Sequence, residues 1–252
     1  MLTKLVYRLF FLGFFAVVPG ALAADSGMML SPRVGLNAYM ALVDQQLEHA
    51  RDGLRIVAAS DNAASGDWDR IKGPLAVFAK DTPTSAAVWF VRPDGSYFTV
   101  DAGRMSQNLG DRGYFPGLMA GHEVAGDLVI SKATGKRSTI IAVPIYAGGR
   151  VIGAVGVSIA MERVATLIDD KIAFPRQVIF YALDEHGQIA LHRDPKLSFE
   201  FAERLGSKTL AQAVAEMLAK PEGMVRYEFQ GAQRTAIFKK SPVTRWVYVL
   251  RW

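Results

Sequence analysis

The sequence predicts an α+β protein with a long N-terminal helix and two modules, each an antiparallel sheet with flanking helices. Apolar residues recur at alternating spacings of four and three over residues 36–57, which is typical of a helix. Pairs of β-rich segments are joined by the turns Asp94-Gly95 and His186-Gly187, and the second half of the chain repeats the plan of the first. At 252 residues, 50% of them hydrophobic, the chain can form one large domain or two small ones.

Residues 1–23 have the features of a secretory signal peptide. Lys4 and Arg8 precede an apolar run that a Pro-Gly pair interrupts well short of the roughly twenty residues that a membrane span requires. We therefore expect cleavage after Ala23 and a periplasmic or secreted protein. An uncleaved membrane anchor is the alternative.

Composition excludes several classes of site. The sequence has no cysteine, which excludes a thiol nucleophile, a cysteine-ligated metal and a disulfide. The net charge is +5, and the basic residues are scattered rather than gathered with aromatic residues. We therefore expect no nucleic-acid partner.

Residues 31–80 form a predicted N-terminal helical segment. A long helix begins near Ser31-Pro32, and a shorter helix runs from Trp68 to Phe78. The apolar stripe of the long helix is typical both of packing on a sheet and of packing on a second copy in a homodimer. The sequence leaves both interpretations open.

Residues 84–170 form the first predicted module. Asp94-Gly95 supplies the turn of a hairpin, and the segment over residues 102–136 is predicted to be irregular. The predicted elements are strands over 87–91, 97–100, 139–145 and 151–159 and a helix over 161–169.

Residues 176–252 form the second predicted module. Its helix carries Leu210, Val214 and Met217 on one face, with Ser207 as the expected N-cap. The predicted strands are 177–183, 188–191, 225–229, 235–238 and 246–250.

Three segments together resemble the double Cache sensor domain. They run from Trp89 to Ser96, from Asp111 to Phe115 and from Val151 to Ile159, and the resemblance extends over residues 33–252. It implies a PAS-like extracytoplasmic sensor, here in a stand-alone secreted form without a cofactor. It also implies that residues 84–170 are the membrane-distal, ligand-binding module and residues 176–252 the membrane-proximal module.

The resemblance also implies a ligand site. In amino-acid-binding members an arginine followed by an aromatic pair clamps the ligand carboxylate, and Arg112 with Tyr114-Phe115 matches this arrangement. The chain departs from the pattern at Gln107, where an aromatic residue is expected, and at Ser158, where an acid is expected. Without that acid a ligand ammonium lacks a counter-ion, so an organic acid is favoured over an amino acid.

Further residues are candidates for the same site. Trp89 and Tyr97 lie on one face of paired strands, with Phe90 and Phe98 on the other, and the sequence does not decide which face meets the ligand. The resemblance adds Ser131 and Ser138 beside a turn.

Each of these candidates has a structural interpretation. Arg112 could form a salt bridge to Asp111 or another acid, while Tyr114 and Phe115 could fill the core. Lys132 and Lys136, which flank the same turn as the serines, are expected to be exposed.

Motifs of metal and phosphate chemistry fail on their spacing. His122-Glu123 lacks a second histidine one helical turn on, and Gly135-Lys136 lacks the leading glycine of a phosphate loop, since that position is Ile130. No serine lies in a nucleophile elbow. We therefore assign no metal and no catalytic residue.

These observations favour a periplasmic small-molecule-binding sensor that is not an enzyme. Because the chain ends soon after the strand over 246–250, we expect its signal to pass through a membrane receptor or kinase, as in chemotaxis. A ligand-free structural or interaction module of the same fold is the alternative. An unrecognised hydrolase is the third hypothesis.

Overall fold

The computed structural model describes residues 31–252, and the predicted signal peptide lies outside this range. In the described part, no helix combines the length and apolar character that crossing a membrane requires. The predicted α+β fold, with an N-terminal helix followed by antiparallel sheets and flanking helices, is confirmed.

The N-terminal helical segment contains three helices. The long helix α1 spans Pro32–Ala58, and α3 spans Trp68–Lys80, as predicted. The Asp67 side chain caps α3 by accepting a hydrogen bond from the backbone N–H of Asp69. A single-turn helix, α2 (Asp61–Ala64), lies between them.

The first sheet has six antiparallel strands in the order β3-β2-β1-β6-β5-β4. The predicted hairpin pairs Trp89 with Thr99, and its turn residue Gly95 has a φ of 79°, a conformation that favours glycine. The strands are β1 (Ser85–Val91), β2 (Ser96–Thr99), β3 (Gly103–Asn108), β4 (Val124–Ile130), β5 (Arg137–Ala147) and β6 (Arg150–Ala160).

The prediction that residues 102–136 are irregular is wrong. They contain the edge strands β3 and β4 and a short helix, α4 (Phe115–Met119). Strand β3 is mostly exposed and lacks an alternating apolar pattern. In β4 a register shift at Gly126, with a φ of 117°, interrupts the alternation.

The second sheet has five antiparallel strands in the order β8-β7-β11-β10-β9. Ser207 is the N-cap of the covering helix, as predicted, and its hydroxyl accepts a hydrogen bond from the Leu210 N–H at 3.3 Å. The elements are α5 (Met161–Ile172), β7 (Ile179–Leu183), β8 (Ile189–His192), two short 3-10 segments (Pro195–Leu197 and Ala202–Arg204), α6 (Lys208–Ala219), β9 (Glu222–Phe229), β10 (Ala232–Lys240) and β11 (Val247–Arg251).

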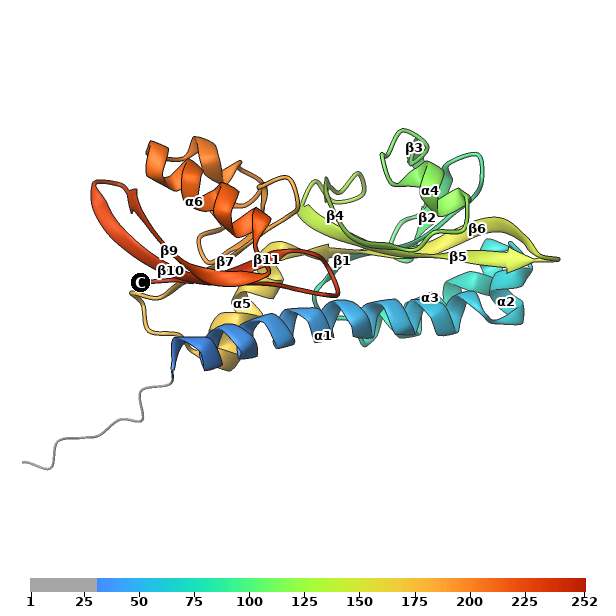
Figure 1. Cartoon of the computed structure of the whole chain (residues 1–252). Coiled ribbons are helices and arrows are strands. Elements are labelled where there is room, and N and C mark those ends of the chain that lie inside the picture. The colour runs from blue at the N-terminus through green and yellow to red at the C-terminus, as the bar shows by residue number, and fades with distance from the viewer. Residues whose placement is uncertain (1–30) are drawn as a thin grey trace, which may run out of the picture. The chain divides into compact units, whose positions relative to one another are not determined.

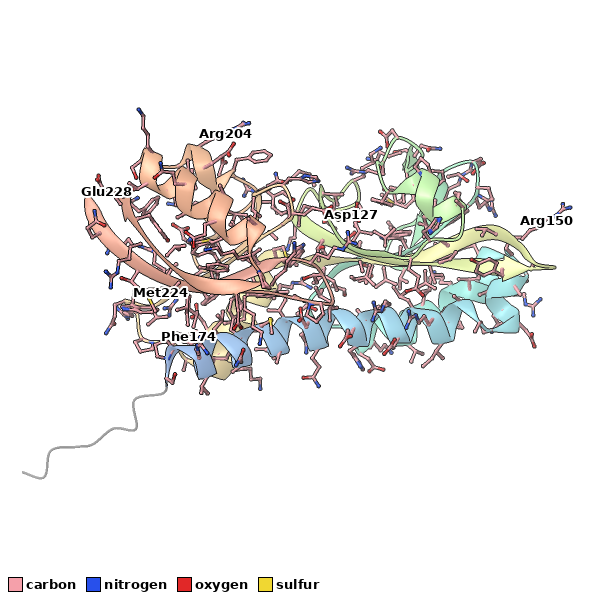
Figure 2. The ribbon with its side chains drawn as sticks, viewed as in Figure 1. Asp127, Arg150, Phe174, Arg204, Met224 and Glu228 are labelled. Carbon is pink, nitrogen blue, oxygen red and sulfur yellow. The ribbon has the colours of Figure 1, made fainter. Side chains whose placement is uncertain are left out.

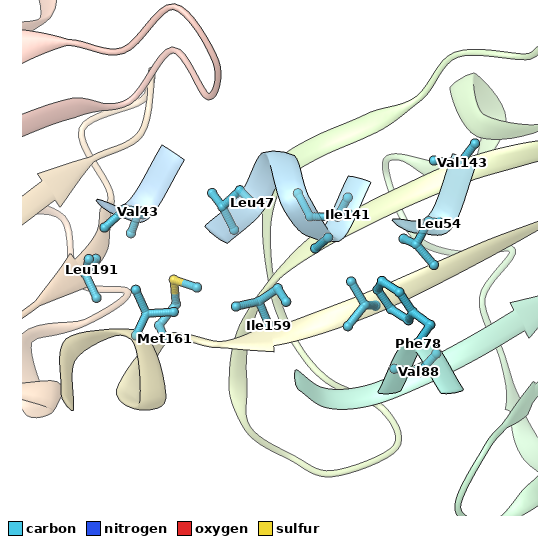
Figure 3. Close-up of a cluster of buried hydrophobic side chains, with 14 of the residues drawn as sticks. Val43, Leu47, Leu54, Phe78, Val88, Ile141, Val143, Ile159, Met161 and Leu191 are labelled. Carbon is cyan, nitrogen blue, oxygen red and sulfur yellow. The ribbon is translucent and has the colours of Figure 1, made fainter. Parts of the chain in front are cut away.

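Helix α1 runs along one side of both sheets, while α4 and α6 lie on the other side (Figure 1). Its apolar stripe, including Val43, Leu47 and Leu54, is buried in one cluster that spans both sheets. Figure 3 shows part of this cluster, in which Leu54 lies near Val143 of β5 and Val43 lies near Leu191 of β8. The two sheets therefore share a core along a single helix.

Polar contacts also tie α1 to each half of the molecule. The buried carboxylate of Asp44 accepts hydrogen bonds from the hydroxyls of Ser241 at 2.8 Å and Tyr248 at 2.9 Å. Burial raises the pKa of Asp44. Toward the other end of α1, Arg55 donates from two nitrogens to the two carboxylate oxygens of Glu123, each at 2.7 Å.

Candidate ligand-binding site

Residues of the first sheet and of the chain segments around α4 line a small cavity. These segments lie on the side of the first sheet opposite α1 (Figure 1). Strands of the sheet form its floor, and the loop before α4 and the turn after β4 form its walls. Its lining residues are Trp89, Tyr97, Leu109, Arg112, Tyr114, Val129, Ser131, Lys132, Ala133, Ile140 and Ser158.

The register of the sheet decides which aromatic residues face the cavity. Trp89 pairs with Gly156 of β6, and its indole occupies the space where a side chain at Gly156 would lie, with ring atoms 2.3–2.8 Å from that Cβ position. Phe90 and Phe98 face the other way, and Phe98 stacks on Trp68 of α3 at a centroid distance of 5.2 Å. Trp89 and Tyr97 therefore form the cavity side of the hairpin.

Arg112 is held at the wall of the cavity without an acidic partner. One of its terminal nitrogens donates to the carbonyl oxygen of Ile130, the last residue of β4, at 2.7 Å. Its Nε is buried and has no hydrogen-bond partner among residues 31–252. Asp111 pairs instead with Lys132, whose Nζ lies 2.5 Å and 2.7 Å from the two carboxylate oxygens. The alternative of an Arg112–Asp111 salt bridge is therefore wrong.

Two tyrosines complete the polar lining. The Tyr97 hydroxyl is buried and, like Arg112 Nε, has no partner within the described chain. Burial raises the pKa of Tyr97 and of Tyr114, and the positive charge of Arg112 opposes both shifts. Both hydroxyls therefore stay protonated at neutral pH and are able to donate. Buried polar groups are nearly always hydrogen-bonded, so the two donors without a partner, Arg112 Nε and the Tyr97 hydroxyl, indicate a place for an acceptor.

The charge of the cavity is positive. Arg112 and Lys132 line it, and none of its lining residues within the described chain is acidic. Asp111 neutralises Lys132 from outside the lining, with a side chain that is 69% exposed. Arg112 therefore carries the one lining charge without a counter-ion among residues 31–252.

The cavity is small. Its volume is about 10 Å³, which is room for one water molecule. A larger guest enters only if a wall moves. The turn from Ser131 to Lys136 is the wall that we expect to move. It is closed by two backbone hydrogen bonds, and its Lys132 donates to the Asp111 carboxylate and to the carbonyl oxygen of Asn108.

The family model of the Cache domain matches residues 35–251. The chain is a Cache-domain protein. The match confirms the resemblance that the hairpin, the arginine-bearing loop and the glycine-rich strand predicted. No curated protein matches the sequence significantly.

Solved sensory domains share the fold of this Cache protein. The ligand binding domain of the Pseudomonas aeruginosa amino acid chemoreceptor PctB in complex with L-Arg matches with a TM-score of 0.70 and 14% identity, over 87% of this chain and 92% of that one. The sensor domain of the V. cholerae histidine kinase DctB matches with a TM-score of 0.63 and 11% identity, over 87% and 94%.

A third solved structure is longer than the Cache protein. The extracellular ligand binding receptor from Desulfohalobium retbaense matches with a TM-score of 0.71 and 12% identity, and the match covers 88% of this chain but 40% of that receptor. At these identities the likeness establishes the fold.

The structure brings most of the predicted site residues of the Cache protein together. Three of them lie outside the lining of the cavity. Gln107 is exposed on the edge strand β3, and Phe115 packs in the core beside the cavity. Ser138 is buried, and its hydroxyl donates to the carbonyl of Lys136 at 3.2 Å. The predicted residues that line the cavity are Trp89, Tyr97, Arg112, Tyr114, Ser131 and Ser158.

Sequence reasoning missed other lining residues of the Cache protein. Lys132 was expected to be exposed, but its side chain is only 22% exposed because it reaches back to Asp111. Ile140 belongs to a strand that is buried on both faces, so apolar character alone does not place it in the cavity. Ile140 lies two residues after Ser138, and side chains two positions apart on a strand lie on the same face of the sheet. This spacing is the signal in the sequence that relates Ile140 to the predicted site.

Proposed function

We propose that this protein is an extracytoplasmic sensory protein that binds a small carboxylate in the first-sheet cavity and signals through a membrane receptor or kinase, without catalysing a reaction. The observation that carries the proposal is the pair of buried donors, Arg112 Nε and the Tyr97 hydroxyl, which have no partner among residues 31–252. A carboxylate supplies the acceptor and the negative charge that both donors lack.

An organic acid suits the cavity better than an amino acid. PctB is an amino acid chemoreceptor whose structure contains L-Arg. In this chain the lining offers a guanidinium for a carboxylate, but at Ser158 it offers a hydroxyl and no charge for an ammonium. Burying an unpaired ammonium costs several kcal/mol, so amino acids are expected to bind poorly.

Strand β4 connects the cavity to α1. Its last residue, Ile130, accepts the hydrogen bond from Arg112, and Glu123, which directly precedes the strand, pairs with Arg55 of α1. A ligand that displaces Arg112 therefore also displaces the C-terminal end of β4, while the ion pair with Arg55 fixes the N-terminal end of the strand to α1. Signalling requires that the ligand bind the two resulting states with different affinity.

A ligand-free structural or interaction module of the same fold is the second candidate function. The cavity volume of about 10 Å³ favours it, because no metabolite fits such a space without movement of the walls. The unpaired donors weigh against it, since a module that had lost its ligand gains stability by replacing them with apolar side chains.

A thermal-shift screen tests the proposed function. We expect organic acids to raise the melting temperature by about 5 °C at a concentration roughly 20 times Kd, and amino acids to leave it unchanged. Arg112→Gln is expected to weaken the binding of the acid by roughly 10- to 100-fold, because it removes a charge-assisted hydrogen bond. Arg104→Gln, at an exposed position of β3, is the matched control.

Two results of this screen contradict the proposal. Stabilisation by amino acids and not by organic acids shows that the site accommodates an ammonium. Absence of stabilisation by any metabolite, in a protein that melts cooperatively, favours the structural module.

A further inference from the structure

A second cavity lies within the other half of the molecule, between α6 and the five-stranded sheet. Its volume is about 40 Å³, roughly the room of three water molecules and larger than that of the first cavity. Figure 2 labels Arg204, the last residue of the 3-10 segment whose Ala202 lines this cavity, and Glu228, which lies between two lining residues of β9. The cavity shares no lining residue with the first one.

One arginine lines this cavity, and a second arginine outside the lining lies near the first. Arg251 of β11 lines it and lies over the ring of Phe229 at 5.5 Å. Arg234 of β10 is close enough to help lower the pKa of Arg251, although burial is the larger cause of that shift. Neither guanidinium forms a salt bridge with a carboxylate in residues 31–252.

The Arg234 side chain also contains an orphan donor. Its Nε is buried and has no hydrogen-bond partner within the described chain. Two neighbouring positive charges that are partly removed from water repel each other, and an anion between them relieves this cost. An anion at this position is therefore stabilising, and no carboxylate of residues 31–252 forms a salt bridge with either arginine.

Neutral hydrogen-bond donors also line this second cavity. His192 stacks on Tyr181 at a centroid distance of 5.8 Å. Its Nδ1 lies 2.8 Å from the backbone nitrogen of Asp194 and 3.1 Å from the carbonyl oxygen of the same residue. In the tautomer in which Nδ1 accepts the shorter of these two bonds, Nε2 carries the proton. The hydroxyls of Tyr181 and Tyr227 lie 3.1 Å apart, and Met217 Sδ is a second acceptor 4.0 Å from the Tyr181 hydroxyl. When Tyr181 donates to Tyr227, the Tyr227 proton is available to a ligand. The side chains of His192, Tyr181 and Tyr227 line the cavity.

The remaining walls are apolar. Ile189, Leu197, Leu205 and Leu210 are among the lining residues. Such walls favour a hydrocarbon substituent and disfavour a fully hydrated inorganic anion.

We propose that this second cavity binds a small monocarboxylate with an apolar substituent, held by Arg251 and His192 with its tail among the leucines. The site is separate from the first-sheet cavity and does not depend on its function. Its anion selectivity comes from the positive charge of the arginines, and its size selectivity comes from the small volume of the cavity, about 40 Å³.

Titration of the purified exported protein with isobutyrate tests the proposal, with isobutyramide as the neutral probe of the same shape. The titration is carried out in the Arg112→Gln variant, so that a ligand in the first cavity does not contribute. We expect isobutyrate to shift the NMR signals of the His192 imidazole saturably, and isobutyramide to leave them in place. Unchanged His192 signals at saturating isobutyrate, or equal shifts with the amide, overturn the proposal.

A second variant tests whether the Arg251 guanidinium binds the acid. Arg251→Gln in the same background is expected to weaken isobutyrate binding about tenfold or more, because a charge-assisted hydrogen bond is lost. Arg226→Gln is the matched control, since Arg226 is exposed on β9 and alternates with the lining residue Tyr227. Equal affinity of the Arg251→Gln and Arg226→Gln proteins also overturns the proposal, and the His192 titration decides the question if Arg251→Gln does not fold.

Discussion

Replacement of Leu54 by alanine is expected to lower the free energy of unfolding by about 3 kcal/mol. Leu54 is fully buried at the contact of α1 with the first sheet, in the cluster shown in Figure 3. The substitution removes buried methyl groups and leaves a cavity that the close-packed surroundings fill only in part. Denaturant unfolding of the purified protein measures the loss.

Ile56→Ala is the matched control for this loss. Ile56 lies two residues further along α1, and its side chain is 75% exposed. Both substitutions favour the helix slightly, so they differ mainly in burial. We expect Ile56→Ala to change the free energy of unfolding by less than about 0.5 kcal/mol. Equal effects of the two variants contradict the burial of the α1 stripe on the sheet.

Acid is expected to destabilise the protein through His192. Burial lowers the pKa of His192 to about 4, below the value of about 6.5 in the unfolded chain. Between pH 6.5 and about pH 4 the imidazole binds a proton in the unfolded state but not in the folded state. The free energy of unfolding therefore falls as the pH falls through this range. The contribution amounts to about 3 kcal/mol between pH 7 and pH 4.

His192→Asn isolates this contribution. The asparagine Oδ1 can accept the Asp194 N–H in place of the imidazole Nδ1, but the side chain does not titrate. The difference in unfolding free energy between the wild type and this variant is expected to change by about 3 kcal/mol from pH 7 to pH 4. His186→Asn, at a side chain that is 75% exposed, is the control. A pH-independent difference for His192→Asn contradicts the burial of the neutral imidazole.

Local patterns in the sequence predict the regular part of the fold well. The stripe of α1 and the turns at Gly95 and Gly187 are local signals, and both glycines have a φ of 79° in the structure. Strands β3 and β4 escaped prediction because edge strands are half exposed, and because the bulge at Gly126 moves the apolar residues out of step.

The candidate site was predictable only in part, for a different reason. The hairpin and loop residues Trp89, Tyr97, Arg112 and Tyr114 belong to segments that resemble the family, and the structure brings them together. The contact of Lys132 with Asp111 joins residues that are distant in the sequence, and no local pattern encodes such a pairing. The second cavity depends on the same kind of information, because Arg234 and Arg251 approach only through the pairing of β10 with β11.

The proposed function requires that a carboxylate bind in the first cavity beside Arg112. A crystal structure with the organic acid that gives the largest thermal shift tests this most directly. We expect a carboxylate oxygen within about 3 Å of both Arg112 Nε and the Tyr97 hydroxyl, with the turn that carries Lys132 displaced. An acid that binds elsewhere, while Arg112 Nε remains without a partner and the turn that carries Lys132 is not displaced, contradicts the proposed function.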